Sequence, residues 1–355
     1  MNLYITHCVL ALIPFLLATL AMPTLADTLS NPADDAWTLN FYLENDLFTN
    51  SDEQYTNGVR VSWVSPEVNS FIDDPTIPAW ARRVNSLLSR LDPQPAPFER
   101  NPSHHFILTL GQQMYTPSDR DRTTLDPDDR PYAGWLYLGF GYHSQTRHQL
   151  KSFNVNLGVV GPWSLAEESQ NLIHDLRGLE RFKGWDNQLH NEPGIQLLFE
   201  RKQRLLQGGI FGNIQYDLIG HAGASLGNVA TYINTGAEYR IGYMIPQDFG
   251  TSALRIGGDN STPGAGDPRF HDQWGVHLFL SLDGRWVLRD IFLDGNTFRD
   301  SHSVDKRALV ADAAWGVAAT WERWKLSLAR YYRTQQFAGQ GGGHKFGSLA
   351  LSYSF

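Results

Sequence analysis

The sequence predicts an all-β fold: a twelve-stranded antiparallel transmembrane β-barrel with a short helix in an extracellular loop. Three observations predict it. Apolar residues repeat with a period of two along much of the chain, which is the repeat of a strand. The polar face of these segments carries small and polar residues, as the lumen of a membrane barrel does. After residue 26 no apolar run approaches the length of a spanning helix.

The first 26 residues resemble a signal peptide. Residues 9–22 form an apolar run of suitable length, and PTLA at 23–26 offers small residues where a signal peptidase cuts. We expect cleavage after Ala26, which leaves 27–355 as one outer-membrane β-barrel domain. The only cysteine, Cys8, lies in this leader, so the exported chain would have no disulfide and no thiol nucleophile.

Charge narrows the range of partners. The formal net charge is −8, and the leader contributes no charged side chain to it. Bulk charge of this sign argues against a protein that is steered to polyanions, so we expect no nucleic-acid partner.

Period-two segments recur from one end of the chain to the other. In 37–43 Trp37, Leu39 and Phe41 alternate with polar residues, and the last ten residues, FGSLALSYSF, alternate in the same way. Trp and Tyr edge the apolar face, as in the girdle of an outer-membrane barrel; a secreted β-sandwich is the alternative. The predicted strands are 37–45, 55–64, 105–115, 132–143, 150–160, 193–204, 207–218, 228–243, 273–290, 309–322, 325–335 and 346–355.

The even number of strands assigns sides to the loops. If both termini are periplasmic, loop 1 (46–54), loop 2 (116–131) and loop 3 (161–192) lie outside. The insertions at 65–104 and 244–272 then lie on the periplasmic side, and the first contains PAWARRVNSLLSRL, an amphipathic helix by its pattern.

Loop 3 contains a predicted helix. Ser164-Leu165-Ala166-Glu167 matches a capping box that would start it, and Gly178 is a suitable stop. An apolar flank would seat this helix on the barrel rim; its members are Leu165, Leu172, Ile173 and Leu176.

Two polar residues on this helix suggest chemistry. Gln170 and His174 are spaced i, i+4 and point the same way, and Glu180 follows where a loop could fold it back to the imidazole. A histidine held by a carboxylate is a suitable general base for activating water. The alternative is a solvated surface histidine.

The three outer loops would converge at one rim. They would bring together a base, carboxylates, amides, a hydroxyl and a cation. The candidates are His174, Asp46, Glu180, Asn45, Gln170, Thr56 and Arg122.

The chain resembles the family of outer-membrane lipid A 3′-O-deacylases. The matching motifs are Asn45-Asp46, Tyr55-Thr56-Asn57-Gly58, QQMYTPS at 112–118, GVVGP at 158–162, and the segment from Gln170-Asn171 through His174 and Glu180 to Trp185. Their order and approximate spacing extend over most of the chain after the leader.

This resemblance implies a calcium-dependent esterase at the outer rim that hydrolyses the 3′-linked acyloxyacyl ester of lipid A, the lipid of the outer leaflet. It implies His174 as the base that activates water and Glu180 as the residue that orients it. Asp46 would bind calcium, while Asn45, Thr56 and Gln170 would line the site. Arg122 falls near a family lysine and would contact a lipid A phosphate. The partners implied are lipopolysaccharide and the outer membrane.

Three other functions remain open at the level of sequence. An outer-membrane phospholipase would use a serine nucleophile, and Ser164 and Ser169 lie near His174. A non-enzymatic porin or adhesin fits the same barrel. A surface protease is the third. The oligomeric state is not indicated.

Overall fold

The computed structural model describes residues 36–45, 54–68, 102–251, 262–264, 267–271 and 273–355. The leader at 1–26, Asp46 and the helix expected near 78–91 lie outside these ranges.

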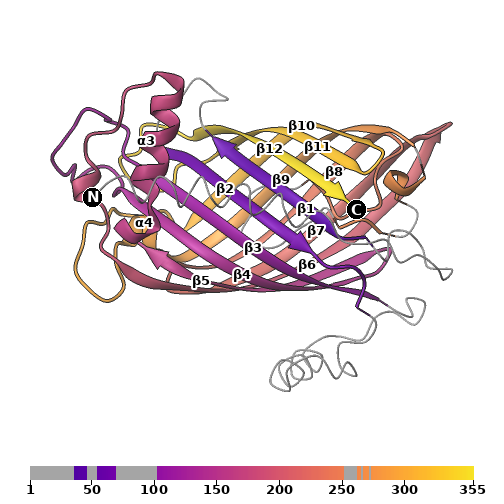
Figure 1. Ribbon diagram of the computed structural model, residues 1–355, viewed down its shortest axis with the longest axis horizontal. Helices are drawn as coiled ribbons and strands as arrows, with labels where there is room; N and C mark the ends of the chain where they lie inside the picture. Colours follow the sequence, from indigo (N-terminus) through magenta and orange to yellow (C-terminus); the bar gives the residue numbers. More distant parts are fainter. Residues whose placement is uncertain (1–35, 46–53, 69–101, 252–261, 265–266, 272) are drawn as a thin grey trace, which may run out of the picture. The chain divides into compact units, whose positions relative to one another are not determined.

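Twelve antiparallel strands close into a barrel in which β1 pairs with β12 and each other strand pairs with its sequence neighbours (Figure 1). This confirms the predicted fold class. The strand β9 runs unbroken through Asp283-Gly284, as predicted. The strands are β1 (Thr38–Asn45), β2 (Gln54–Val64), β3 (Ser103–Thr116), β4 (Ala133–Gln145), β5 (Gln149–Val160), β6 (Glu192–Phe211), β7 (Ile214–Gly227), β8 (Ala230–Tyr243), β9 (Gly275–Asp290), β10 (Leu309–Trp321), β11 (Trp324–Arg333) and β12 (His344–Ser354).

The turn between β6 and β7 lies seven residues later than the sequence predicted, because β6 continues to Phe211 instead of ending at 204. Gly212 makes the turn with a φ of 54°, and Phe211 pairs with Ile214 across it. A two-residue Gly-Asn connection is a favoured hairpin turn, since glycine adopts positive φ without steric cost.

The wall separates apolar from polar side chains. In β1 Tyr42 and Asn40 are buried toward the lumen, whereas Phe41, and Trp37 just before the strand, are exposed on the outer face. An apolar outer face and a polar lumen are typical of a barrel that spans a lipid bilayer. Among the helices of the described residues, none has the length and hydropathy to cross a membrane.

The two ends of the barrel differ in the elements that they carry. The loop end carries α3 (Ala166–Arg177) and α4 (Ile291–Asp294), and the terminal end is the opposite one, where β12 finishes (Figure 1). Aromatic side chains fill the lumen toward the loop end. Tyr115 stacks on Phe292 of α4 at 4.2 Å, and Tyr331 stacks on Phe346 at 4.8 Å. These rings belong to one buried apolar cluster.

Charged side chains fill the lumen toward the terminal end. Asp248, from the segment between β8 and β9, accepts from Arg240 Nη1 at 2.7 Å and from Lys325 Nζ at 2.5 Å. Arg240 also pairs with Asp217 at 2.5 Å, and Arg269 lies 3.6 Å from Asp248. We call this group the terminal plug. Part of the 244–272 insertion therefore packs inside the barrel.

Candidate active site

A close contact between a loop and the wall sets the position of α3. A Cβ at Gly134, near the start of β4, would lie 2.1 Å from Ser164 Oγ and 2.3 Å from Ala166 Cβ. Gln112 of β3 donates from Nε2 to the Ser164 carbonyl oxygen at 2.7 Å. Glycine at 134 lets the loop approach the strand, so the helix begins directly against the wall.

The helix packs on the outward face of the wall. In β4 Leu138 and Phe140 are exposed and share a face with Gly134, because side chains alternate along a strand. In β3 Leu110 is exposed, whereas Met114 on the same face is buried in a cluster with residues of loop 3. The site therefore lies between α3 and the outer wall, and not in the lumen.

The start of α3 differs from the predicted one. Leu165 precedes the helix with a left-handed φ of 56°, and no side chain caps the first turn. Ser164 belongs to the 3-10 helix η2 (Pro162–Ser164) instead. The predicted capping box is wrong, because the contact with Gly134 buries the Ser164 hydroxyl away from the first-turn N–H groups.

The helix buries its polar face. Gln170 and His174 are each 1% exposed, whereas Leu172 is 50% and Leu176 78% exposed. The prediction that the apolar flank seats the helix is therefore wrong. Outside the wall the surroundings are lipid, so apolar side chains can face outward while polar ones are enclosed against the strands.

An aromatic cluster closes the space beneath the helix. Phe182 and Trp185 of loop 3 pack with Tyr132, Met114 and Ala166. The Tyr132 ring lies 5.1 Å from that of Trp185, and burial raises the pKa of Tyr132 to about 12. Tyr132 is therefore neutral at physiological pH, and the cluster adds no charge to the site.

One main-chain contact orients His174. Its Nδ1 lies 2.6 Å from the carbonyl oxygen of Glu180. Because a carbonyl oxygen only accepts, Nδ1 carries a proton, and in the tautomer that this contact selects the lone pair is on Nε2. Gly178 ends the helix with a φ of 68°, as predicted, and turns the chain so that Glu180 meets the ring.

The carboxylate of Glu180 lies elsewhere. Its side chain is 70% exposed and pairs with Arg120 at 3.3 Å. Glu180 thus approaches His174 through its carbonyl group, where the sequence had suggested the carboxylate.

Gln170 is held by an indole. Trp185 Nε1 donates to Gln170 Oε1 at 2.8 Å, which fixes the amide with its Nε2 toward the interior. That Nε2 is buried and has no hydrogen-bond partner among the described residues. We call the buried region between α3 and the wall, to which Gln170 and His174 belong, the wall pocket. Gln170 contributes its unused amide NH2 group to this region, and His174 contributes the Nε2 lone pair.

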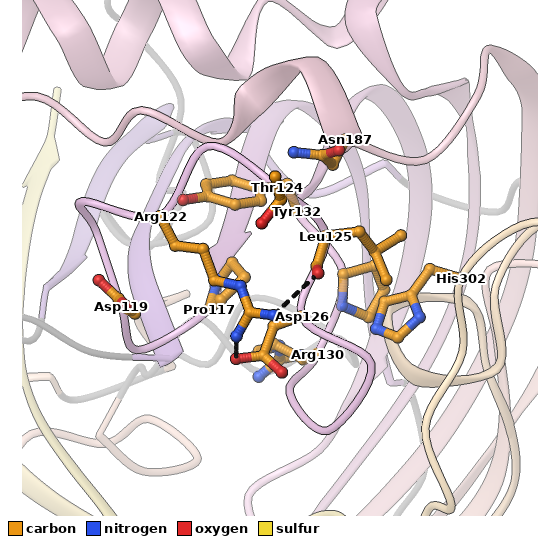
Figure 2. Close-up of a pocket in the computed structure, with 11 residues that line it drawn as sticks. Pro117, Asp119, Arg122, Thr124, Leu125, Asp126, Arg130, Tyr132, Asn187 and His302 are labelled. Atoms are coloured by element: carbon orange, nitrogen blue, oxygen red, sulfur yellow. Dashed lines mark hydrogen bonds and ion pairs between the residues drawn. The ribbon is translucent and has the colours of Figure 1, made fainter.

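Loops 2 and 3 are joined, but Arg122 is not part of the wall pocket. Lys183 N donates to the Arg120 carbonyl at 2.9 Å, which links the loops. Arg122 donates to Asp126 at 2.5 Å and to the Leu125 carbonyl at 3.1 Å, in a shallow pocket that also contains His302 (Figure 2). Neither His174 nor Gln170 lines that pocket.

The root of loop 1 lies in the same row of the wall as the start of α3. Asn45 is opposite Asn57 of β2, Asn57 is opposite Met114 of β3, and Met114 is opposite Gly134 of β4. Asn45 is 7% exposed. The backbone of Thr56 lies in β2 where the register shifts, and its side chain is outside what the structure describes.

The described residues contain no group of three His, Cys, Asp or Glu side chains that could hold a metal. Asp46, predicted to bind calcium, is outside these residues. Near the helix start, burial raises the pKa of Glu167, and the negative charges of Glu168 and Asp186 add to this effect.

Comparison with known proteins identifies the family of the chain. The family model described as "Outer membrane protein LpxR" matches residues 12–355. The chain belongs to the LpxR family of outer membrane proteins. This confirms the resemblance to the lipid A 3′-O-deacylases that the motifs suggested.

A solved structure supports the barrel fold. LpxR from Salmonella typhimurium is 17% identical, with a TM-score of 0.68 over 90% of this chain and 100% of that one. The beta domain of the Bordetella autotransporter BrkA is 9% identical, with a TM-score of 0.45 over 91% and 100% of the chains. No curated protein matches.

Sequence reasoning missed three residues that build the wall pocket of this LpxR-family chain. Gly134, Gln112 and Trp185 position α3 and Gln170, yet none had been given a role. Gln112 and Trp185 were within matching motifs, which was a usable signal. Gly134 carried none, because its contact with loop 3 depends on tertiary structure.

Proposed function

We propose that the protein hydrolyses the 3′-linked acyloxyacyl ester of lipid A, with a water activated by His174 as the nucleophile. The observation that carries this proposal is the orientation of the ring. Its Nδ1 proton is committed to the Glu180 carbonyl, so the basic Nε2 is available in the wall pocket.

The chemistry needs few groups. His174 Nε2 takes a proton from water, and the water oxygen attacks the ester carbonyl carbon. The tetrahedral adduct expels the 3′ sugar oxygen, which takes the proton back from Nε2. The buried N–H of Gln170 is a suitable donor to the oxyanion, because a preorganised donor needs no reorganisation during the reaction.

Substrate access follows from the position of the pocket. A site on the outward face of the wall meets a lipid laterally, without removing it from its leaflet. We therefore place the loop end on the extracellular side, where lipid A is found. Acyl release in intact cells tests this orientation together with the chemistry.

Calcium is part of the proposal. When bound, it would act as a Lewis acid on the ester carbonyl. The root of loop 1 offers oxygen donors of the kind that calcium prefers, Asn45 and Asp46. We expect EGTA to stop turnover, and Asp46→Asn to weaken calcium binding measured by calorimetry on the purified protein. Full turnover in metal-free protein would reject calcium as the cofactor.

Two observations favour this function over the alternatives. No described hydrogen bond joins Ser164 or Ser169 to His174, and the Ser164 hydroxyl is buried against Gly134, which disfavours a serine nucleophile. The buried cluster that contains Tyr115, Phe292 and Tyr331 and the terminal plug obstruct the lumen, which disfavours a porin.

Replacement of the base tests the function directly. We expect His174→Ala to lower deacylation by about a hundred- to ten-thousand-fold, the usual contribution of a general base. Mass spectrometry of lipid A measures the loss of the acyloxyacyl group. His190→Ala is the matched control, because His190 is exposed in the same loop. Normal deacylation by His174→Ala protein would reject the proposal.

A further inference from the structure

A hollow opens in the wall on the other side of the barrel from α3. Its volume is about 640 Å³, and residues of β8, β9 and β10 line it. In β9 Leu282 and Trp286 are exposed and share a face with Gly284, so the hollow opens outward. Gly284 lies between Thr235 of β8 and Ala311 of β10, and these three small residues form the floor.

Larger side chains bound this floor toward the loop end. Trp286 lies between Ile233 and Leu309 in the adjacent row, and each of the three is at least half exposed. The result is a short apolar groove with a raised edge. It is continuous with the apolar wall, so lipid chains are the molecules that reach it.

Two tryptophans give the depth of the groove. Trp274, just before β9, and Trp286 are both well exposed. A strand tilted by about 40° rises about 30 Å between these positions, which is the thickness of the hydrocarbon layer. Trp286 therefore marks one interface, Gly284 lies just inside it, and Arg307 lies beyond it at the level of the headgroups.

Arg307 brings an uncompensated positive charge to this edge. Its main-chain N–H donates to the Gln336 carbonyl at 2.7 Å, which fixes the backbone. Its exposed guanidinium has no hydrogen bond or ion pair within the described part of the chain. The neighbouring Arg285 and Arg333 differ, since both pair with Asp312.

We propose that this groove binds one lipid A molecule as a resident lipid, with an acyl chain over Gly284 and a phosphate on Arg307. A guanidinium binds phosphate strongly because two N–H groups can donate in parallel. The outer leaflet supplies this lipid, so the inference rests on the orientation given under the proposed function and not on the deacylation chemistry. The groove and the wall pocket lie on different strands and do not share residues.

The test compares bound lipid in four variants by native mass spectrometry. Each is made in the His174→Ala background so that added lipid A is not hydrolysed. Gly284→Leu fills the hollow without a clash, because the nearest atom to an added Cβ is Thr235 O at 3.9 Å. Gly209→Leu is its control, since Gly209 has the same clearance, to Ile214 O. Arg299→Ala, at an exposed loop position, is the control for Arg307→Ala.

We expect Gly284→Leu protein to retain one lipid A molecule fewer than Gly209→Leu protein. We expect Arg307→Ala to weaken lipid A retention about tenfold relative to Arg299→Ala, because a charged hydrogen bond is lost. Equal retention by Gly284→Leu and Gly209→Leu would overturn the proposal. So would equal retention of phosphatidylglycerol, because the groove would then not select lipid A. Deacylation by Gly284→Leu with His174 intact should be unchanged, which separates this outcome from failure of the proposed function.

Discussion

The terminal plug and the wall pocket are both buried and polar, but they differ in whether their polar atoms have partners. In the plug Asp248 receives Arg240 and Lys325 on its two oxygens, and its charge is compensated. In the wall pocket Gln170 Nε2 is buried without a hydrogen-bond partner in the described ranges of the chain. An unsatisfied buried donor costs about 1–3 kcal/mol. The plug therefore contributes stability, and the wall pocket keeps a hydrogen-bond donor available for a ligand.

The largest expected effect comes from breaking the plug. Asp248→Ala leaves Lys325 and Arg240 buried without their shared partner, so we expect a loss of about 3–5 kcal/mol in the free energy of unfolding. Thermal unfolding in detergent, followed by circular dichroism, measures it. Deacylation below the melting temperature should remain normal. A variant as stable as the parent but inactive would reverse the roles assigned to the two regions.

Acid should weaken the plug for the same reason. Burial opposes ionisation of Asp248, but the charges of Lys325, Arg240 and Arg269 hold its pKa well below the usual range. A group with a depressed folded pKa contributes stability above its unfolded pKa of about 4, and this stability is lost as pH falls further. We expect the melting temperature to fall below about pH 4. Asp248→Asn should be less stable at neutral pH and should show a smaller acid dependence.

A smaller effect on deacylation is expected when Gln170 stays in the wall pocket but loses the hydrogen bond that orients it. Trp185→Phe keeps the ring and removes the N–H that holds Gln170 Oε1, so the amide can rotate. We expect deacylation to fall about tenfold through loss of orientation, with little change in stability. Gln170→Ala provides the limit, because it removes the amide altogether. If Trp185→Phe were as active as the parent, orientation of Gln170 would not matter to the reaction.

The smallest effect tests whether Glu180 acts through its main-chain carbonyl or through its side-chain carboxylate. His174 contacts the carbonyl of Glu180, while the exposed carboxylate pairs with Arg120. Exposed ion pairs contribute little, so we expect Glu180→Gln to retain activity within about twofold. Steady-state deacylation with Arg120→Gln alongside measures this. A loss comparable to that of His174→Ala would show that the carboxylate takes part in the reaction.

Much of the fold was predictable because period two is imposed by the wall itself. Each strand separates lipid from lumen, so Trp37 and Phe41 alternate with Asn40 and Tyr42 in a readable pattern. The turn after β6 was misplaced because the alternation near it is interrupted by two register shifts, which no sequence pattern revealed.

The pairing of Gln170 with His174 was predictable, but the geometry around it was not. The spacing of Gln170 and His174 placed both on one face, and the structure buries that face. The apolar flank misled, because the rule that apolar residues face the protein holds in water and reverses against lipid. The contact of Gly134 with loop 3 depends on residues distant in sequence, so no local pattern could predict it.

Obstruction of the lumen from both ends has a consequence for the cell. An enzyme that worked through an open channel would let small solutes leak wherever it was inserted. Here aromatic rings and paired charges occupy the lumen, and the proposed reaction takes place on the outward face of the wall. A bacterium could therefore carry many copies of this protein and still exclude hydrophilic antibiotics, which separates remodelling of its surface from any loss of the permeability barrier.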